Sequence, residues 1–379
     1  MGCSVMSELK VDTIVNLAGT GKPNLPVSPT LGGTAISSAN TYSYTSSGTE
    51  PSSPKNGAIW WDSSNNEVYL YIAGEFKKVT LNASSSSAPA WSGDRGVITG
   101  ESFTNYEIQY FNIASTSSAA DFGNLSVTRG FKLGSCGSST RGTFGGGYAS
   151  SRRDEIDYIT HSTTGNATDF GNLSVARSYG GAVANGTRGL YAGGLNSAGS
   201  YVNTVDYITI ANTGNATDFG DLSAANSKRL GSGNNDTRAI FSGGLGGNSS
   251  NIIEYFTFAS AGNATDFGDL LAAHNGDMQG CSDATRTVFG GQQSGSNVIQ
   301  YITTATAGNA TDFGDFTVNL DGCAGVANLT KGVFAGGITP SNPANNLEII
   351  TIQTAGNATD HGDLAEALSY PVACSGAPS

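Results

Sequence analysis

The feature of this chain that most limits its fold is a heptapeptide, GNATDFG, that returns at a nearly constant interval. It occurs at residues 165–171, 214–220, 262–268 and 308–314, and looser copies end at Gly123 (SAADFG) and Gly362 (GNATDHG). The aspartates of the six copies are Asp121, Asp169, Asp218, Asp266, Asp312 and Asp360. Their separations are 48, 49, 48, 46 and 48 residues, so the fold must repeat one structural unit six times.

Each unit contains four segments of strand length. In the third copy these are residues 178–186, 188–194, 205–210 and 217–222. The second-strand segments of the six copies are 96–100, 142–147, 189–194, 239–244, 287–292 and 332–337. The 53 Gly and only 13% charged residues favour strands joined by many turns. Four strands per unit of this length are typical of β-propeller blades, so we predict an all-β fold.

The two ends of the repeat region complete one blade between them. The strand beginning at Arg95 has no small-residue strand before it, and residues 367–379 read as a first strand with nothing after it. A propeller leaves no open sheet edge when its first and last blades meet, and a blade shared by the termini secures that junction. We therefore predict a six-bladed propeller over residues 86–379, closed by the C-terminal strand.

The layout of the repeat resembles the kelch family over residues 93–379. An Arg precedes a strand that ends in Gly-Gly, a strand with Tyr follows, and then an aromatic residue stands three positions before Leu, as in Phe170 and Leu173. Kelch repeats usually have Trp at this aromatic position. This chain has Phe122, Phe170, Phe219, Phe267, Phe313 and His361 there. The resemblance implies a kelch-like propeller.

Blade geometry assigns the loops to two faces. In an up-and-down blade, the turns after the first and third strands share one face, and the loop after the second strand shares the other with the link to the next blade. The first set repeats almost unchanged, as NGTRG-like and GNATDFG turns, and we call its face the uniform face. The second set varies, as in YASSRRDE, LNSAGSYVNT and ITPSNPANN, and defines the variable face. Binding commonly lies on such variable loops of a rigid scaffold.

The variable loops carry aromatic, Arg and amide side chains, which suit sugar hydroxyls through stacking and hydrogen bonding. The candidate receptor-binding residues are Tyr148, Arg152, Arg153, Asn196, Tyr201, Asn203, Asn248, Gln292, Gln293, Asn342, Asn345 and Asn346. The alternative interpretation of each is a solvated loop residue under no functional constraint.

Charge and hydropathy exclude several partners. The formal net charge is −12 and the pI about 4.6, which repels phosphate backbones, so we expect no nucleic-acid partner. No run of about 18 apolar residues occurs, and the N-terminus lacks the apolar core of a signal peptide, so we expect no membrane insertion.

Catalytic and metal motifs are also missing. The DFG triplets lack the Gly-rich loop, strand Lys and HRD-type loop of a kinase, and we expect their Asp to cap a tight turn instead. The three His are about a hundred residues apart, and no carboxylate pair stands out from the repeat. Cys136, Cys281, Cys323 and Cys374 lie between small residues, which indicates packing. We predict no catalytic residue, no metal site, no cofactor and no enzyme activity.

The first 85 residues have a different composition. Residues 1–33 are extended and punctuated by Gly and Pro, with too few apolar residues for a core, so we expect them to order against a partner. The candidate attachment residues in this segment are Leu9, Val11, Ile14, Val15, Leu17, Pro23 and Leu25. Residues 34–50 are Ser/Thr-rich and predict a linker. Residues 51–85 predict a small aromatic-rich β meander.

The meander resembles modules of bacteriophage tail fibres and related virion proteins. The matching residues are Pro54, Asn56, Gly57, Trp61, Asp62, Tyr69, Tyr71, Gly74 and Phe76. The opening KVDTIVNLAGTGKPN and the AGNATDFGDL repeats look like structural proteins of marine cyanobacterial phages.

This resemblance implies a cyanophage virion component, a tail fibre or similar appendage, made in the host cytoplasm. It implies an N-terminus that attaches to other virion proteins, a propeller that binds a host-surface glycan or protein, and a homo-oligomer, with a trimer expected. Two alternatives stay open: a cellular kelch-like binding module, and a glycan-cleaving propeller enzyme.

Overall fold

The computed structural model divides the chain into two compact units, Met1–Ser86 and Ser87–Ser379. The described residues are 30–31, 34–35, 44–47, 49–54, 58–62, 67–72, 75–78, 90–100, 106–130, 134–225, 230–244, 249–274, 276–291, 296–340 and 342–377. The seven candidate attachment residues between Leu9 and Leu25 lie outside them. Among the described residues, no helix has the length and apolarity needed to cross a membrane.

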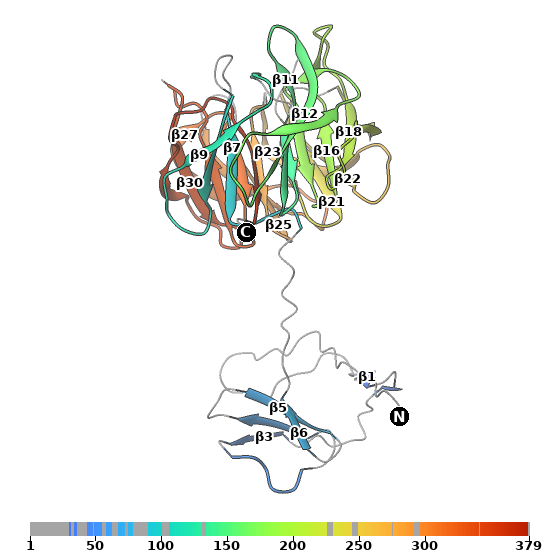
Figure 1. Cartoon of the computed structure of the whole chain (residues 1–379), viewed down its shortest axis with the longest axis vertical. Coiled ribbons are helices and arrows are strands. Elements are labelled where there is room, and N and C mark those ends of the chain that lie inside the picture. Colours follow the sequence, from blue (N-terminus) through green and yellow to red (C-terminus); the bar gives the residue numbers. More distant parts are fainter. Residues whose placement is uncertain are drawn as a thin grey trace. The chain divides into compact units, whose positions relative to one another are not determined.

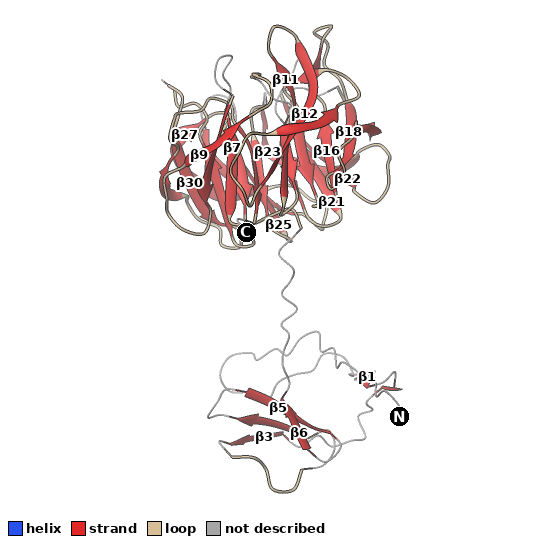
Figure 2. Cartoon of the chain, in the orientation of Figure 1, coloured by secondary structure: helices blue, strands red, loops and turns tan. Residues whose placement is uncertain are grey.

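The second unit is a six-bladed β-propeller, as predicted (Figures 1 and 2). Six four-stranded antiparallel sheets form the blades, and the first strand of each contacts the first strands of both neighbouring blades, which closes the ring. We number the blades from the one that contains both ends of this unit.

The strands occupy the same position in each blade. The first strands are β32 (Val372–Gly376), β10 (Gly134–Gly137), β15 (Gly181–Ala184), β20 (Gly231–Asn234), β24 (Gln279–Ser282) and β28 (Ala324–Ala327). The second strands are β7 (Arg95–Thr99), β11 (Arg141–Tyr148), β16 (Arg188–Ala192), β21 (Arg238–Ser242), β25 (Arg286–Gly290) and β29 (Lys331–Ala335). The third strands are β8 (Glu107–Asn112), β12 (Arg152–Thr160), β18 (Thr204–Thr209), β22 (Ser250–Thr257), β26 (Ser296–Thr303) and β30 (Asn346–Thr351). The fourth strands are β9 (Ala120–Asn124), β13 (Thr168–Asn172), β19 (Thr217–Asp221), β23 (Thr265–His274), β27 (Thr311–Leu320) and β31 (Thr359–Asp363).

Blade 1 joins the two ends of the unit. The C-terminal strand β32 pairs antiparallel with β7, with Val372 opposite Thr99 and Gly376 opposite Arg95. Closure by the C-terminal strand is therefore confirmed.

The GNATDFG repeat forms the outer seam between blades. The Gly165 amide donates to the Phe122 carbonyl of the preceding blade at 2.7 Å, and the Ala167 amide donates to the Asn124 carbonyl at 2.8 Å. The Asn166 side-chain oxygen accepts from the Asn124 amide at 3.1 Å. The same bonds recur from the turns beginning at Gly214, Gly262, Gly308 and Gly356. The motif repeats because each of these five copies closes an equivalent seam, while between blades 6 and 1 the Ala119 amide donates to the Asp363 carbonyl at 2.9 Å.

A second seam element lies nearer the uniform face. In blade 2 the Arg141 guanidinium lies 4.7 Å from the Tyr158 ring centroid, and the Tyr158 ring packs edge-on against buried Phe170. Arg141 also donates to the carbonyl of Ile210 in blade 3 at 3.1 Å. Blades 1 to 5 share this arrangement. Blade 6 departs from it with Lys331, Ile349 and His361, and His361 Nε2 lies 2.8 Å from the Asn112 carbonyl oxygen of blade 1.

Small side chains match each other in size across the inner seams. A Cβ on Gly189 would lie 2.7 Å from Cys136 Sγ of the preceding blade, so only Gly fits opposite this Cys. Between blades 4 and 5 the Gly lies on the first strand and the larger residue on the second strand of the next blade: a Cβ on Gly233 would lie 2.1 Å from Thr287 Cγ2. The thiols of Cys136, Cys281, Cys323 and Cys374 are free and buried, which confirms their packing role. Cys323, however, precedes β28 instead of occupying the third position of a first strand.

The first unit contains a four-stranded sheet in the order β3 (Tyr44–Ser47), β4 (Ile59–Asp62), β5 (Glu67–Ile72) and β6 (Glu75–Lys78), and a separate pair of short strands, β1 (Thr30–Leu31) and β2 (Thr34–Ala35). Strands β4 to β6 form the predicted meander, and the Trp60 ring stacks on Tyr69 at 4.8 Å. Strand β3 lies in the range 34–50 that we interpreted as a linker and pairs parallel with β4. A parallel partner is joined by a long connection, which the alternation pattern of a meander does not reveal.

Candidate functional site

Exposed apolar side chains gather on the variable face. Six large hydrophobic residues are exposed in the described part of the chain, and five of them lie on variable-face loops or on strand ends beside them. These five are Tyr106, Val175, Tyr201, Ile252 and Leu271. The sixth, Leu329, lies in the turn after β28 on the uniform face. Leu271 is half exposed, at 50%. These side chains, together with the differing loops, make the variable face the candidate surface for contacts.

Strand pairing in the β11–β12 hairpin continues closer to its connecting loop than in the other pairs of second and third strands. A register shift between Gly145 and Gly147 bends β11, and pairing then continues to Tyr148 opposite Arg152. The Arg152 guanidinium lies 5.7 Å from the Tyr148 ring centroid. The hairpin therefore presents a cationic and an aromatic group together.

Arg153 points to a neighbouring acid on the same strand. Its Nε donates to Glu155 at 3.0 Å, and its Nη2 forms an ion pair with the same carboxylate. Both side chains are partly exposed, so this pair contributes little to stability and leaves the guanidinium at the surface. Although partial burial acts to raise it, the pKa of Glu155 is lowered by a backbone hydrogen bond and by Arg153.

The three candidate receptor-binding residues of blade 3 have different surroundings. The Asn196 side-chain oxygen accepts from the amides of Ala198 and Ser200, both at 3.0 Å, and so holds its own loop. Asn203 is half-buried, and its Nδ2 lies 3.4 Å from the Leu222 carbonyl. Tyr201 is 37% exposed at the rim of the loop. Of the three, Tyr201 has the character of a contact residue.

The remaining candidates lie on blade 6 or outside the described residues. Asn342 and Asn345 are exposed, and Asn346 begins β30 with a half-exposed side chain. The Asn342 carbonyl accepts from the amide and the hydroxyl of Thr339, each at 3.0 Å, which shapes the turn. Asn248, Gln292 and Gln293 lie outside the described residues.

A buried polar layer beneath the variable face was not predicted from the sequence. Each third strand buries one acid or amide that accepts from the chain leaving the preceding blade, as when Asp206 accepts from the Ser174 amide at 3.0 Å. The six are Gln109, Asp157, Asp206, Glu254, Gln300 and Glu348. The recurring Asp, Glu or Gln before the third-strand Tyr was a signal for this layer.

Two fully buried arginines belong to the same layer. Arg177 Nη2 lies 2.8 Å from Asp206 and also donates to the Tyr191 carbonyl, and Arg129 Nη2 lies 3.2 Å from Asp157. Burial acts to lower the pKa of Arg177, and Asp206 opposes that effect. These pairs hold the variable-face links of blades 2 and 3 in place.

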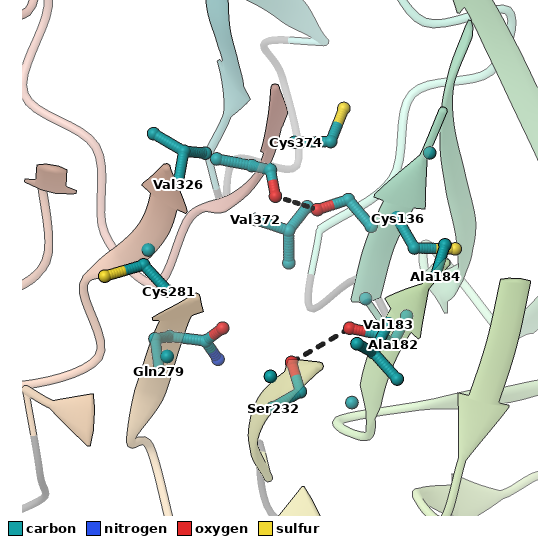
Figure 3. A pocket seen from close by; sticks show the side chains of 18 of the residues that line it. Cys136, Ala182, Val183, Ala184, Ser232, Gln279, Cys281, Val326, Val372 and Cys374 are labelled. Carbon is teal, nitrogen blue, oxygen red and sulfur yellow. Dashed lines mark hydrogen bonds between the residues drawn. The ribbon is translucent and has the colours of Figure 1, made fainter. Parts of the chain in front are cut away.

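An axial cavity runs along the centre of the propeller between the first strands of all six blades (Figure 3). It has a volume of about 90 Å³. Its walls are mostly Gly, Ala, Ser and Cys, and the Gln279 side chain projects into it. Ser135 donates to the Ala373 carbonyl at 2.7 Å and Ser232 to the Ala182 carbonyl at 2.9 Å, so both hydroxyls tie neighbouring first strands together.

The cysteines along this cavity are buried, and burial raises the pKa of each thiol. Burial raises the pKa of Cys136 to about 11, against smaller lowering effects of hydrogen bonds to Thr143 and Tyr191. Burial also raises the pKa values of Cys281 and Cys374. Thiols that stay protonated are poor nucleophiles and poor metal ligands. Within the described ranges, no group of three His, Cys, Asp or Glu residues could hold a metal ion.

Comparison with known proteins adds no family to this description. No family model matches the chain, and no curated protein matches it in sequence. The β-propeller fold and the geometry of its two faces are consistent with a binding module.

Proposed function

We propose that this protein is a structural component of a bacteriophage particle, a fibre or fibre-like appendage of the cyanophage type. Its propeller binds a receptor on the host surface, a glycan in the first instance, and its N-terminal segment attaches the chain to other virion proteins. The proposal is of a binding protein and not of an enzyme, and it includes the trimer expected of fibres.

The observation that carries the binding part is the contrast between the two propeller faces. Every blade meets the same folding demands, and the uniform face repeats accordingly. The loops of the variable face differ between blades, and five of the six exposed large apolar side chains of the described residues lie there. Rigid scaffolds with differing loops commonly bind through those loops. The Tyr148–Arg152 pair and Tyr201 supply the aromatic and cationic groups that favour contact hot spots.

The test compares adsorption of the purified chain to cyanobacterial cells before and after substitution of the variable face. We expect the Arg152→Ala/Arg153→Ala/Tyr201→Ala variant to adsorb at least about tenfold more weakly, with an unchanged melting temperature. The matched control, Leu329→Ala/Lys331→Ala, alters one exposed and one half-buried side chain of the uniform face and should adsorb as the parent does. Equal adsorption of both variants would remove the support for the variable face.

Two further measurements separate the alternatives. In purified phage particles, mass spectrometry should find this chain, and removal of residues 1–33 should prevent its incorporation; a cellular kelch-like module would be absent from particles. Incubation with host envelope polysaccharide should leave the length distribution of the polymer unchanged. Reproducible shortening of the polymer would identify a glycan-cleaving enzyme instead.

A further inference from the structure

The axial cavity is closed at the uniform face and reaches the variable face. At the uniform face the Ala90 carbonyl accepts from the Ser139 amide of blade 2 at 2.5 Å, and Gly186 of blade 3 packs directly on Ala90. This places the next residue, Trp91, among the cavity-lining residues at that end. At the other end Tyr370 and Pro371, which directly precede β32, line the cavity where a link of the variable face ends. The cavity is thus a pocket of the variable face.

The closed end holds two buried polar groups without a partner. Trp91 is 8% exposed and its indole Nε1 has no hydrogen-bond acceptor. Asn234, the last residue of β20, is 6% exposed and its Nδ2 has none either. Both residues line the cavity. Buried donors are nearly always satisfied in folded proteins, so two at one end of a cavity point to a ligand that brings acceptors.

The size and charge of the cavity limit that ligand. One enclosed water needs about 10–15 Å³ of cavity volume, so a cavity of about 90 Å³ has room for roughly six to nine waters. One pyranose ring would displace about this number of waters. No charged side chain lines the cavity in the described part of the chain. An unpaired charge is costly to bury, so the ligand is neutral. Amide, hydroxyl and indole groups together suit sugar hydroxyls, which both donate and accept.

The backbone at the mouth is held in an unusual conformation. Tyr370 has a φ of 43°, and the equivalent residues before β15, β24 and β28, which are Tyr179, Asp277 and Gly322, have φ values of 62°, 62° and 59°. Left-handed conformations are rare for bulky residues such as Tyr and persist where the surrounding structure enforces them, so their recurrence before these first strands is a property of the scaffold. The Tyr370 ring packs on Gly322, whose added Cβ would lie 2.1 Å from Tyr370 Cδ1. The mouth is therefore fixed before any ligand enters.

We infer that the axial cavity is a binding site for one neutral monosaccharide unit, which enters from the variable face and reaches Trp91 Nε1 and Asn234. In the proposed function, the terminal sugar of the receptor glycan would enter this cavity. The biological role of the site therefore rests on that proposed function. Binding of the sugar itself does not depend on it.

The test is isothermal titration of the full chain with glucose, galactose, mannose and N-acetylglucosamine, with glucuronate as the charged comparison. We expect saturable binding of at least one neutral sugar and at least about tenfold weaker binding of glucuronate. Asn234→Leu and Gln279→Leu should each weaken the neutral sugar at least about tenfold, the loss of roughly one hydrogen bond to a buried group. Because Gln279 is only half-buried, its substitution keeps the test valid if Asn234→Leu fails to fold.

The outcomes separate this site from the proposed function. The Arg152→Ala/Arg153→Ala/Tyr201→Ala variant should bind the monosaccharide as the parent does, even though it adsorbs weakly to cells. Absence of binding for all four neutral sugars, or full affinity in both cavity variants, would overturn the inference while leaving receptor binding by the loops intact. Equal binding of glucuronate would overturn the assignment of a neutral ligand. Sugar binding by a chain that never adsorbs to cells would support the site and count against the receptor role.

Discussion

The carbonyl oxygen of Gly165 lies only 2.3 Å from the position that a Cβ of Gly123 would occupy, although the two residues belong to different blades. The same relation joins Gly171 to Gly214, Gly220 to Gly262, Gly268 to Gly308 and Gly314 to Gly356. The glycine that ends each DFG triplet is therefore required by the neighbouring blade as well as by its own φ, which is 144° at Gly123.

Replacing Gly171 by Ala should destabilise the ring strongly. Its φ is 143° and its new Cβ would lie 2.4 Å from the Gly214 carbonyl oxygen, so strain and a backbone clash add. We expect the free energy of unfolding in urea to fall by about 3 kcal/mol. The control is Gly165→Ala, where φ is 155° but nothing lies within 4 Å of the new Cβ. A loss of about 1 kcal/mol is expected there, and equal losses at both positions would show that the inter-blade contact is unimportant.

Replacing the buried ion pair Arg177–Asp206 with uncharged residues should reveal whether the propeller requires its charges. Arg177→Leu alone leaves the fully buried Asp206 without its ion partner, so we expect a loss of about 3–5 kcal/mol in urea unfolding. The double variant Arg177→Leu/Asp206→Gln reproduces the combination of Leu368 with Gln109, found at the equivalent positions between blades 6 and 1. It should recover most of the loss, and a double variant as unstable as the single one would contradict this role for the layer.

Acid should weaken the propeller through His161. Burial, with a smaller effect of Arg95, lowers the pKa of His161 to about 4, so the ring is neutral in the folded chain. The unfolded chain binds a proton below about pH 6.5, and the free energy of unfolding therefore falls as the pH drops from 6.5 toward 4, by up to about 1.4 kcal/mol per pH unit. His161→Leu should show a shallower decline than the parent in urea titrations over this range. Parallel declines would assign the acid sensitivity to other groups.

Removing residues 369–379 should open blade 1. The deletion takes away β32, whose Cys374 and Val372 pack in the core of that blade, and exposes β7 as an edge. We expect a broad, less cooperative thermal transition in calorimetry and a tendency to associate. A single sharp transition at the parental temperature would show that the ring does not depend on this strand.

The sequence predicted the propeller well because every blade repeats the same solution in the same order. The period fixed the number of blades, and the incomplete copies at each end predicted the pairing of β32 with β7. The residues of the neighbouring blade that each GNATDFG turn contacts could not be predicted in this way. Nothing in GNATDFG says that Asn166 bonds to the outer strand of the blade before it, because that contact appears only when the ring is assembled.

The sequence predicted the position of the variable loops but not how each side chain in them is used. Tyr201 and the Tyr148–Arg152 pair lie on the variable face as the blade geometry predicts, and their receptor role stays a prediction. The amide of Asn196 is used inside its own loop, which composition cannot distinguish from an amide that faces a ligand. The axial cavity was not predictable because it is lined by six separate strands, and Trp91 belongs to a segment before the first recognisable repeat.

The size-matched contacts across the inner seams limit which sequence changes this chain can accept during evolution. Cys136 requires Gly189 beside it, whereas Gly233 leaves the space that Thr287 fills. Repeats that look interchangeable in sequence are therefore keyed to particular neighbours. A recombination event that moved one repeat to another place in the gene would put two bulky residues together at one junction and leave a void at another, so the chain should tolerate drift within its loops far more readily than shuffling of its blades.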